Sequence, residues 1–476
     1  MADYERAFFF LLDGARVDVL SHLLARGELP NVSRYLAERG SSGQATSVFP
    51  TVTGVAYIPF VTGRFPGPAN IPGIRWFDRE KYGRTLFSVS RFRNYNGWGS
   101  YLMDRDLAPE TRTLFELLPP ASNIFSGISR GTGLRRNAAY FRRIPYVYHF
   151  FRTGDWDPID RQGRGFLLRA AARRRERFTF HTTLSVDEYS HKHGPFAPRV
   201  LAAYRAFDRV LGELAAALRA SGQLERSLLL LSADHGHAEV AQHLDLEGFF
   251  ERRRLRTLYF PLSARRWFDC DVAVMVGGNG MAHVSLRGRH GWQVRPAGDQ
   301  LLDEHPGLAE DLLAEPAVHL LAWRKSGPDG TLCVRTRTGT AEVKAEDGTV
   351  HYRVQSGTDP LGYPPLPERL SRAQLLERTQ ASEYPDAPLQ LVQLFESPRT
   401  GDLVISAAPG FDLRARFERW SHRSCHGTLH REHIQVPLLS SHPLVPGPWR
   451  TADVFSTVLA ALGQPVPRSD GRALLV

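Results

Sequence analysis

The stretch AFFFLLD at residues 7–13 decides the fold, because it is an unbroken apolar run that ends at an acidic residue. Such a run is typical of a strand that is buried on both faces of a parallel sheet, whereas a half-exposed strand alternates apolar and polar residues. Further strands are expected at 123–128, 178–186 and 227–231, and the segment 196–218 carries apolar side chains at helical spacing. Strands that alternate with helices predict an α/β fold with a doubly wound, mostly parallel sheet.

The region from residue 246 to about residue 400 has a different pattern. It contains three alternating runs at 332–337, 340–344 and 349–354, which are separated by turn residues and predict an antiparallel meander. The α/β pattern then resumes, with strands expected at 402–406 and 434–440 and a helix at 451–462. We therefore predict an α/β core formed by residues 1–245 and 401–476, interrupted by an inserted α+β cap at 246–400.

Composition excludes several classes of protein. The 476 residues are 42% hydrophobic and 23% charged, as in ordinary globular proteins. The three cysteines form no CxxC pair, so disulfides or a thiolate zinc site are not expected to hold the fold together. No apolar stretch approaches the roughly 18 residues of a membrane span, and the run at 7–12 is too short for a signal peptide. These features predict a soluble cytoplasmic protein.

The net charge is +10, and much of it lies in short arginine runs. A basic chain can bind nucleic acid, but no helix-turn-helix pattern and no basic repeat with interleaved aromatic residues accompanies the charge. Nucleic-acid binding therefore rests on net charge alone. Solvated arginine-rich faces explain the charge equally well, and a positive field also attracts small anionic substrates.

Acidic and imidazole side chains gather where the predicted strands end. Ligands of doubly wound sheets bind beyond the carboxyl ends of the strands. Six such side chains lie just after these strands or in the loop before the strand at 434–440: Asp13, Asp187, His191, Asp234, His235 and His426. Three carboxylates and three imidazoles suit two zinc-like ions. Two ions about 4 Å apart clamp the attacking and leaving oxygens of a phosphoryl displacement.

Five segments carry a resemblance to a known family: FLLDGAR (10–16), SVFPTVTG (47–54), VDEYSHKHGP (186–195), SADHGH (232–237) and SCHGTLH (424–430). Together they resemble the alkaline phosphatase superfamily, and within it the type I phosphodiesterase / nucleotide pyrophosphatase branch. The resemblance implies two divalent metal ions, with zinc expected and manganese as the alternative. It implies one ion held by Asp13, Asp234 and His235, and a second held by Asp187, His191 and His426. Four other histidines are expected to pack or to support these ligands: His237, His283, His430 and His433.

A hydroxyl nucleophile is expected in the stretch FPTVT, residues 49–53. The resemblance implies a threonine or serine just after a strand, at the start of a helix, which we predict at 51–61. We predict Thr51 as the nucleophile, with Thr53 as the competing hydroxyl and helix capping as the other role for Thr51. A metal ion stabilises the alkoxide of such a hydroxyl, and a helix N-terminus offers N–H groups to phosphate oxygens. The implied mechanism passes through a phospho-threonine intermediate that water releases.

The resemblance is incomplete at residues 73–78, GIRWFD. Related nucleotide pyrophosphatases usually carry an asparagine there that contacts a phosphate oxygen. Arg75 could replace that contact with a charge-assisted bond, or it could pair with Asp78 or Glu80. The nature of the substrate is therefore less firmly indicated than the type of chemistry.

The predicted function is a two-metal phosphodiesterase or nucleotide pyrophosphatase that acts on a small anionic phosphoester. The alternatives within the same superfamily are a C–P hydrolase that resembles phosphonoacetate hydrolase and takes a phosphonate, and a phosphomonoesterase. A non-catalytic binding protein of the same fold is a further alternative. The intact set of six ligand residues argues against that last alternative.

Overall fold

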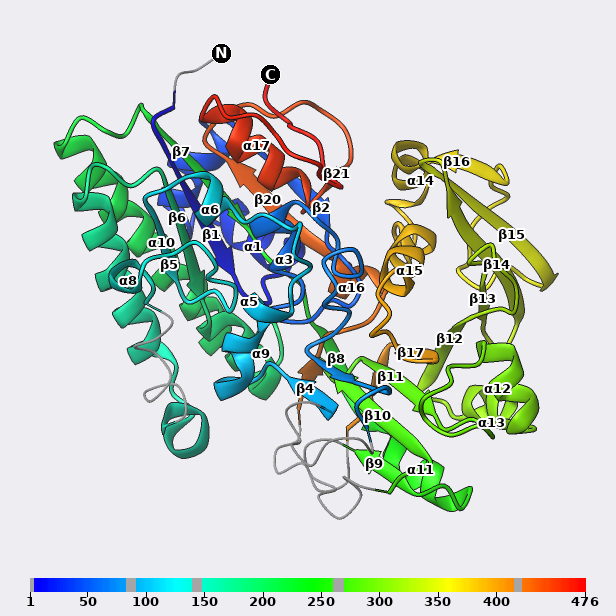
Figure 1. Cartoon of the computed structure of the whole chain (residues 1–476). Coiled ribbons are helices and arrows are strands. Elements are labelled where there is room, and N and C mark those ends of the chain that lie inside the picture. The colour runs from blue at the N-terminus through cyan, green and yellow to red at the C-terminus, as the bar shows by residue number, and fades with distance from the viewer. Residues whose placement is uncertain (1–3, 83–90, 139–147, 260–268, 415–421) are drawn as a thin grey trace.

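The computed structural model describes residues 4–82, 91–138, 148–259, 269–414 and 422–476. Two large sheets organise these residues into two lobes, which lie side by side in Figure 1. One lobe combines the N-terminal half of the chain with its C-terminal end, and the other contains most of the residues between. The overall fold is therefore mixed α/β, as the sequence predicts.

The first lobe is built on a seven-stranded sheet with the order β21-β2-β20-β7-β1-β6-β5. Its strands are β1 (Arg6–Leu12), β2 (Ser41–Thr46), β5 (Ala121–Ile124), β6 (Phe178–Thr183), β7 (Ser227–Ser232), β20 (Gln435–Ser440) and β21 (Trp449–Arg450). Only the two pairings of β20 are antiparallel. The central strand β1 pairs in parallel with both β6 and β7, so the predicted doubly wound, mostly parallel sheet is confirmed.

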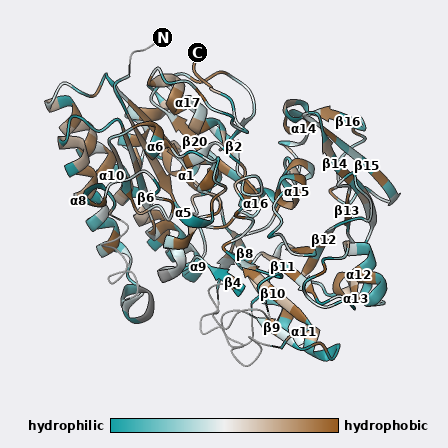
Figure 2. Cartoon of the chain, viewed as in Figure 1, coloured by the Kyte–Doolittle hydropathy of each residue, from teal (hydrophilic) through white to brown (hydrophobic). Residues whose placement is uncertain are grey.

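Helices cover both faces of this sheet, which explains why all seven residues of β1 are buried. Successive side chains of a strand point to opposite faces. Phe9 packs against Phe60 with ring centroids 4.8 Å apart, whereas Phe10 packs against Phe207 at 5.7 Å. The apolar interior appears as brown strands inside this lobe in Figure 2. Its helices are α1 (Val17–Ala25), α2 (Pro30–Val32), α3 (Ile58–Thr62), α5 (Leu102–Asp106), α6 (Leu114–Leu117), α8 (Asp157–Ala172), α9 (Ser185–His193), α10 (Pro198–Ala220), α16 (Arg431–Ile434) and α17 (Asp453–Ala461).

The second lobe is built on a nine-stranded sheet with the order β16-β15-β14-β13-β12-β17-β11-β10-β9. Its strands are β9 (Thr257–Tyr259), β10 (Val272–Gly277), β11 (Met281–Leu286), β12 (Val318–Arg324), β13 (Leu332–Arg335), β14 (Gly339–Glu346), β15 (Thr349–Gly357), β16 (Arg369–Ser371) and β17 (Leu403–Ala407). The meander β13-β14-β15 is antiparallel, as predicted. The helices of this region are α11 (Leu246–Arg252), α12 (Gly298–Glu304), α13 (Leu308–Ala314), α14 (Arg372–Thr379) and α15 (Ala387–Phe395).

Two sequence expectations differ from the structure. The strand expected at 402–406 forms as β17, but it pairs with β11 and β12 of the second sheet rather than with the first sheet. The helix expected at 51–61 is shortened to α3, because Gly54 adopts the left-handed conformation (φ 83°) and breaks a continuous helix. The division into 1–245, 246–400 and 401–476 stays a prediction.

Two small sheets lie near the carboxyl ends of the central strands. One has the order β18-β8-β19 and the other pairs β3 with β4. Their strands are β3 (Arg75–Phe77), β4 (Phe92–Asn94), β8 (Ala238–His243), β18 (Gly410–Asp412) and β19 (Ser424–Cys425). The β8-β19 pair brings the segment around residue 425 beside the end of β7. Among the described residues, no helix combines the length and the apolar character needed to cross a membrane.

Candidate metal centre and active site

Three neighbouring strands deliver the predicted metal ligands to one edge of the first sheet. Asp13 directly follows β1, and Asp234 and His235 follow β7. Asp187 and His191 lie on α9, which begins just after β6. Residues four apart share one face of a helix, and His191 Nε2 is accordingly 3.5 Å from Asp187 Oδ1.

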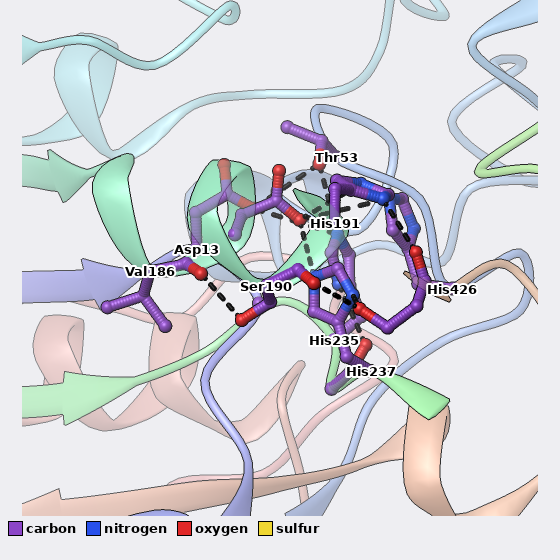
Figure 3. Close-up of polar contacts among 12 residues, drawn as sticks. Asp13, Thr53, Val186, Ser190, His191, His235, His237 and His426 are labelled. Carbon is purple, nitrogen blue, oxygen red and sulfur yellow. Dashed lines mark hydrogen bonds and ion pairs between the residues drawn. The ribbon is translucent and has the colours of Figure 1, made fainter. Parts of the chain in front are cut away.

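The last predicted ligand, His426, comes from the distant segment after β19, and its Nε2 lies 3.9 Å from Asp187 Oδ1. Its ring stacks on that of His235, with centroids 3.7 Å apart and planes 8° apart. The structure therefore brings all six predicted ligands to one place (Figure 3).

The residues form three overlapping groups, each able to offer three ligand atoms within 4.8 Å of one another. The first group, Asp13, Asp234 and His235, is the predicted triad for one ion. The other two groups share Asp187: it joins His191 and His237 in one, and His235 and His426 in the other. Among the described residues, the predicted combination of Asp187, His191 and His426 does not form such a group, and His237 stands beside His191 instead.

Each imidazole of the cluster is held by its Nδ1 atom, which leaves Nε2 facing inward. His191 Nδ1 lies 2.9 Å from the Ser424 carbonyl oxygen, and His426 Nδ1 lies 2.8 Å from the Thr51 carbonyl oxygen. His235 Nδ1 lies 3.2 Å from the carbonyl oxygen of Gly236. A carbonyl only accepts, so Nδ1–H donates and the Nε2 lone pair is free for a metal. This anchoring of the second ring nitrogen is characteristic of metal-binding histidines.

The electrostatics of the cluster also favour a bound cation. Burial raises the pKa of Asp13, Asp187 and Asp234 well above the ordinary aspartate value, and their mutual repulsion adds to the shift. Burial also lowers the pKa of His235 to about 3, and it lowers the pKa of His191 and the other clustered imidazoles well below the ordinary value. The imidazoles are therefore neutral ligands at neutral pH, and the repulsion among the carboxylates is relieved either by protonation or by a bound cation.

The donor set fits two divalent ions. Asp234 Oδ2 is fully buried and has no hydrogen-bond partner among the residues that the structure describes, although it lies 3.2 Å from His235 Nε2. A buried carboxylate oxygen without a donor is costly unless a cation binds it. Mixed imidazole and carboxylate ligands are those that zinc accepts at catalytic sites.

Thr51, the predicted nucleophile, does not face this cluster. Its side chain is fully buried, its Oγ1 donates to the Thr428 carbonyl oxygen at 2.8 Å, and it accepts a hydrogen bond from Gly427 N at 3.0 Å. Together with the bond from His426 Nδ1 to the Thr51 carbonyl, these contacts fasten the loop that carries His426. The geometry gives Thr51 a structural role in positioning that loop.

Thr53, the competing hydroxyl, does face the cluster. Its Oγ1 lies 3.0 Å from His235 Nε2 and 3.3 Å from Asp13 Oδ1. Asp13 is itself oriented by Tyr57, whose hydroxyl donates to Oδ2 at 2.6 Å. Figure 3 shows the Thr53 side chain above the ligand residues, with its hydroxyl directed toward them. Thr53 is half-buried, whereas Thr51 is closed off from solvent.

Sequence reasoning missed several residues that shape the site. Tyr57 lies outside the quoted segments, and only the folded chain brings it to Asp13. Ser424 begins the quoted segment SCHGTLH but was given no role. His237 was expected to pack or to support the ligands, and its spacing in the stretch DHGH was a signal of more. Arg75, which was considered as a phosphate contact, donates from Nη1 to the Val276 carbonyl oxygen at 3.0 Å. The alternative pairing of Arg75 with Asp78 or Glu80 does not form among the described residues, where Asp78 pairs with Lys81 instead.

The second lobe also contacts the site, through the turn between β10 and β11. Gly278 in this turn has φ 57°, and its carbonyl oxygen accepts a hydrogen bond from His426 N at 3.1 Å. A β-carbon at this position would lie 2.6 Å from His426 Nδ1, which is closer than side chains normally approach. The turn therefore limits where the His426 ring can sit.

Replacing Gly278 with alanine is expected to weaken metal binding by about tenfold or more, because the added methyl group displaces His426. Gly330→Ala is the matched control, since Gly330 has a similar φ of 69° but nothing within 4 Å of an added β-carbon. The control should lose only about 1–2 kcal/mol of stability from backbone strain. Competition for zinc with a chromogenic chelator measures the difference. Equal zinc affinity of the two variants would contradict the role assigned to this turn.

Comparison with known proteins gives a family match. The family model described as type I phosphodiesterase / nucleotide pyrophosphatase matches residues 7–428. A search of curated proteins finds no significant match.

Solved structures with the same fold include two kinds of enzyme. Murine ectonucleotide pyrophosphatase / phosphodiesterase 5, as an inactive threonine-to-alanine variant in complex with AMP, is 13% identical, and the match covers 98% of this chain and 97% of that chain with a TM-score of 0.58. Phosphonoacetate hydrolase from Sinorhizobium meliloti 1021, in complex with phosphonoformate, is 15% identical, and the match covers 97% and 96% with a TM-score of 0.58. At these identities the likeness shows the shared fold.

Proposed function

Since the chain belongs to the type I phosphodiesterase / nucleotide pyrophosphatase family and is a hydrolase, we propose that it is a two-metal phosphodiesterase that cleaves phosphate diesters through a covalent intermediate on Thr53. Zinc is the proposed metal, with manganese as the alternative. The proposal revises the sequence prediction in one respect, because it moves the nucleophile from Thr51 to Thr53.

The position of the Thr53 hydroxyl is the observation that carries this proposal. It is the hydroxyl that contacts both Asp13 and His235, two members of one three-ligand group. A threonine hydroxyl at this place is next to the charge that can stabilise its alkoxide. The murine relative is inactive when one of its threonines is replaced by alanine, which supports a threonine in this role.

The residues of the chain would act in two steps. Thr53 Oγ1, once its proton is lost to solvent, attacks phosphorus in line with the leaving group, and the bond from phosphorus to that oxygen breaks. The leaving oxygen takes up a proton from solvent and departs as the alcohol. Water then attacks the same phosphorus and loses a proton to solvent, the bond from phosphorus to Thr53 Oγ1 breaks, and Oγ1 regains a proton. Tyr57 keeps Asp13 in place through its 2.6 Å hydrogen bond during both steps. Two divalent ions bound by the cluster would lower the pKa of the threonine and of water and stabilise charge on the phosphoryl oxygens.

The charge of the site favours a diester over a monoester. Three ionised carboxylates and neutral imidazoles, together with two divalent ions, leave one net positive charge while Thr53 keeps its proton, which matches the single negative charge of a bound diester. A monoester carries about one more negative charge and needs an added cation. Among the described residues, Arg16 pairs with Asp18 and Glu432, and Arg75 donates to the Val276 carbonyl oxygen, so neither offsets that charge.

A C–P hydrolase that takes phosphonoacetate is the second candidate function. The specific observation in its favour is that the phosphonoacetate hydrolase fold matches this chain with the same TM-score, 0.58, as the pyrophosphatase fold. Phosphonoacetate carries both a phosphonate and a carboxylate, so it would also need cationic side chains beyond the two metals. The charge of the cluster therefore favours the diester.

The substrate preference is tested by kinetics on the zinc-loaded protein. We expect kcat/KM for bis(p-nitrophenyl) phosphate to exceed that for p-nitrophenyl phosphate, with little release of phosphate from phosphonoacetate. Arg75→Ala should leave this order unchanged, because its guanidinium is bound to a backbone carbonyl. A tenfold or greater preference for the monoester, about 1.4 kcal/mol at the transition state, would refute the phosphodiesterase assignment. Efficient cleavage of phosphonoacetate would establish the second candidate instead.

A further inference from the structure

His237 lies in the metal cluster, although the sequence predicts only that it packs or supports the ligands and neither predicted triad includes it. It is fully buried, and its Nε2 lies 2.7 Å from Asp187 Oδ1. It forms a three-ligand group with Asp187 and His191. In Figure 3 the His237 ring lies in the same cluster as the rings of His235 and His191.

The hydrogen bonds of Ser424 determine which ring nitrogen of His237 carries the proton. Ser424 Oγ is 2.7 Å from the Ser190 carbonyl oxygen, and a carbonyl only accepts, so the hydroxyl donates its one proton there. Ser424 Oγ must then accept from His237 Nδ1, which is 3.1 Å away. In the neutral ring, Nε2 therefore has no proton and directs its lone pair at Asp187 Oδ1.

Two acceptor atoms 2.7 Å apart repel each other unless a proton or a metal cation lies between them. The arrangement repeats that of the two predicted ligands His191 and His426, whose Nδ1 atoms are held by carbonyl oxygens and whose Nε2 atoms face inward. The Nδ1 atom of His237 is therefore held by a hydrogen bond and its Nε2 lone pair is free, as in a metal ligand. A histidine that only oriented Asp187 would donate Nε2–H to it instead.

The backbone just after β1 leaves room for the His237 ring. Gly14 follows Asp13 and has φ 72°, and a β-carbon there would lie 2.7 Å from His237 Nε2. The glycine N–H donates to Asp234 Oδ1 at 3.2 Å. Any larger residue at position 14 would push His237 out of the cluster.

We propose that His237, through Nε2, binds the metal ion held by Asp187 and His191, as a ligand in addition to the six predicted ones. This inference rests on the proposed two-metal function. It makes the two ions unequal. One has Asp13, Asp234 and His235 and is adjacent to Thr53, whereas the other has Asp187 and up to three imidazoles. The ion with more imidazole ligands is expected to be the harder one to remove.

The test compares His237→Ala with His237→Gln in the zinc-loaded protein. The amide of glutamine can donate to Asp187, so it can replace a histidine that merely positions that carboxylate, but it is a poor zinc ligand. If His237 is a ligand, both variants should bind one of the two zinc ions at least about 100-fold more weakly in chelator competition. His193→Gln, which changes an exposed histidine on α9, is the matched control and should bind as the unaltered protein does.

Several results would overturn the inference. Normal zinc binding by His237→Gln together with weak binding by His237→Ala would show a positioning role, and normal binding by both would show packing alone. Should the variants fail to fold, a zinc-loaded crystal structure of the unaltered protein decides: Nε2 at about 2.0–2.1 Å from an ion supports the inference, and Nε2 retained against Asp187 with no ion in bonding distance refutes it. These readouts need no turnover. Zinc binding that depends on His237 in a protein without phosphodiesterase activity would overturn the proposed function and leave the ligand intact.

Discussion

Thr53→Ala is expected to reduce phosphodiester hydrolysis by about 10³-fold or more, because it removes the nucleophile. Zinc content should stay unchanged, since the hydroxyl of Thr53 is not among the predicted metal ligands. Thr53→Ser keeps a hydroxyl at the same place and should keep measurable activity. Steady-state kinetics on bis(p-nitrophenyl) phosphate, with zinc measured on the same samples, provide the test.

Thr51→Ala is the matched comparison for this prediction, since it removes the same hydroxyl two residues away. Its buried Oγ1 bonds Thr428 O and Gly427 N, so its loss should cost about 1–3 kcal/mol of stability and loosen the loop of His426. Activity should fall modestly, through that loop, and Thr51→Ser should restore it. If Thr53→Ala were fully active and Thr51→Ala were inactive, Thr51 rather than Thr53 would be the nucleophile.

Removing metal is expected to abolish turnover, by at least about 100-fold, and zinc should restore it with about two ions per chain. Without a cation, Asp13, Asp187 and Asp234 repel one another in a buried site, and the apo-protein should also melt at a lower temperature. Chelation followed by titration with zinc, monitored by activity and by thermal melting, tests both effects. Undiminished activity after complete removal of metal would refute the two-metal account.

Much of the fold can be predicted from the sequence, because each buried parallel strand is an unbroken apolar run. The run at 7–12 became β1, and its burial on both faces follows directly from its unbroken apolar character. Strand β17 shows that an apolar pattern predicts a strand but not the sheet that it joins. Its apolar pattern indicates burial, but the choice between the two sheets is made by pairing with β11 and β12, which lie far away in the sequence.

The clustering of the six predicted ligand residues was predictable for a similar reason, since each falls just beyond the end of a strand or in a characteristic short motif. The choice between Thr51 and Thr53 was not. The two hydroxyls are chemically alike and only two residues apart. The hydrogen bonds that hold the Thr51 hydroxyl away from the metal cluster involve residues 427 and 428, more than 370 positions later in the chain. The left-handed conformation of Gly54, which shortens the expected helix, could not be predicted from the presence of a glycine alone.

His237 illustrates a different limit. A sequence can show that a histidine is near a ligand motif, but it cannot show which ring nitrogen is protonated. That assignment depends on Ser424, a residue that the β8-β19 pairing brings beside the cluster from 187 positions away. The proposed role of His237 therefore follows only from the hydrogen-bond donors and acceptors around its ring in the folded protein.

The stereochemical course at phosphorus tests the central claim most directly. One enantiomer of a nucleoside aryl phosphorothioate diester is hydrolysed in oxygen-18 water, and the configuration of the labelled nucleoside phosphorothioate is determined. Each in-line displacement inverts phosphorus, so attack by Thr53 followed by attack of water predicts net retention. Net inversion would mean that water attacks the substrate directly, and it would contradict a covalent intermediate on Thr53.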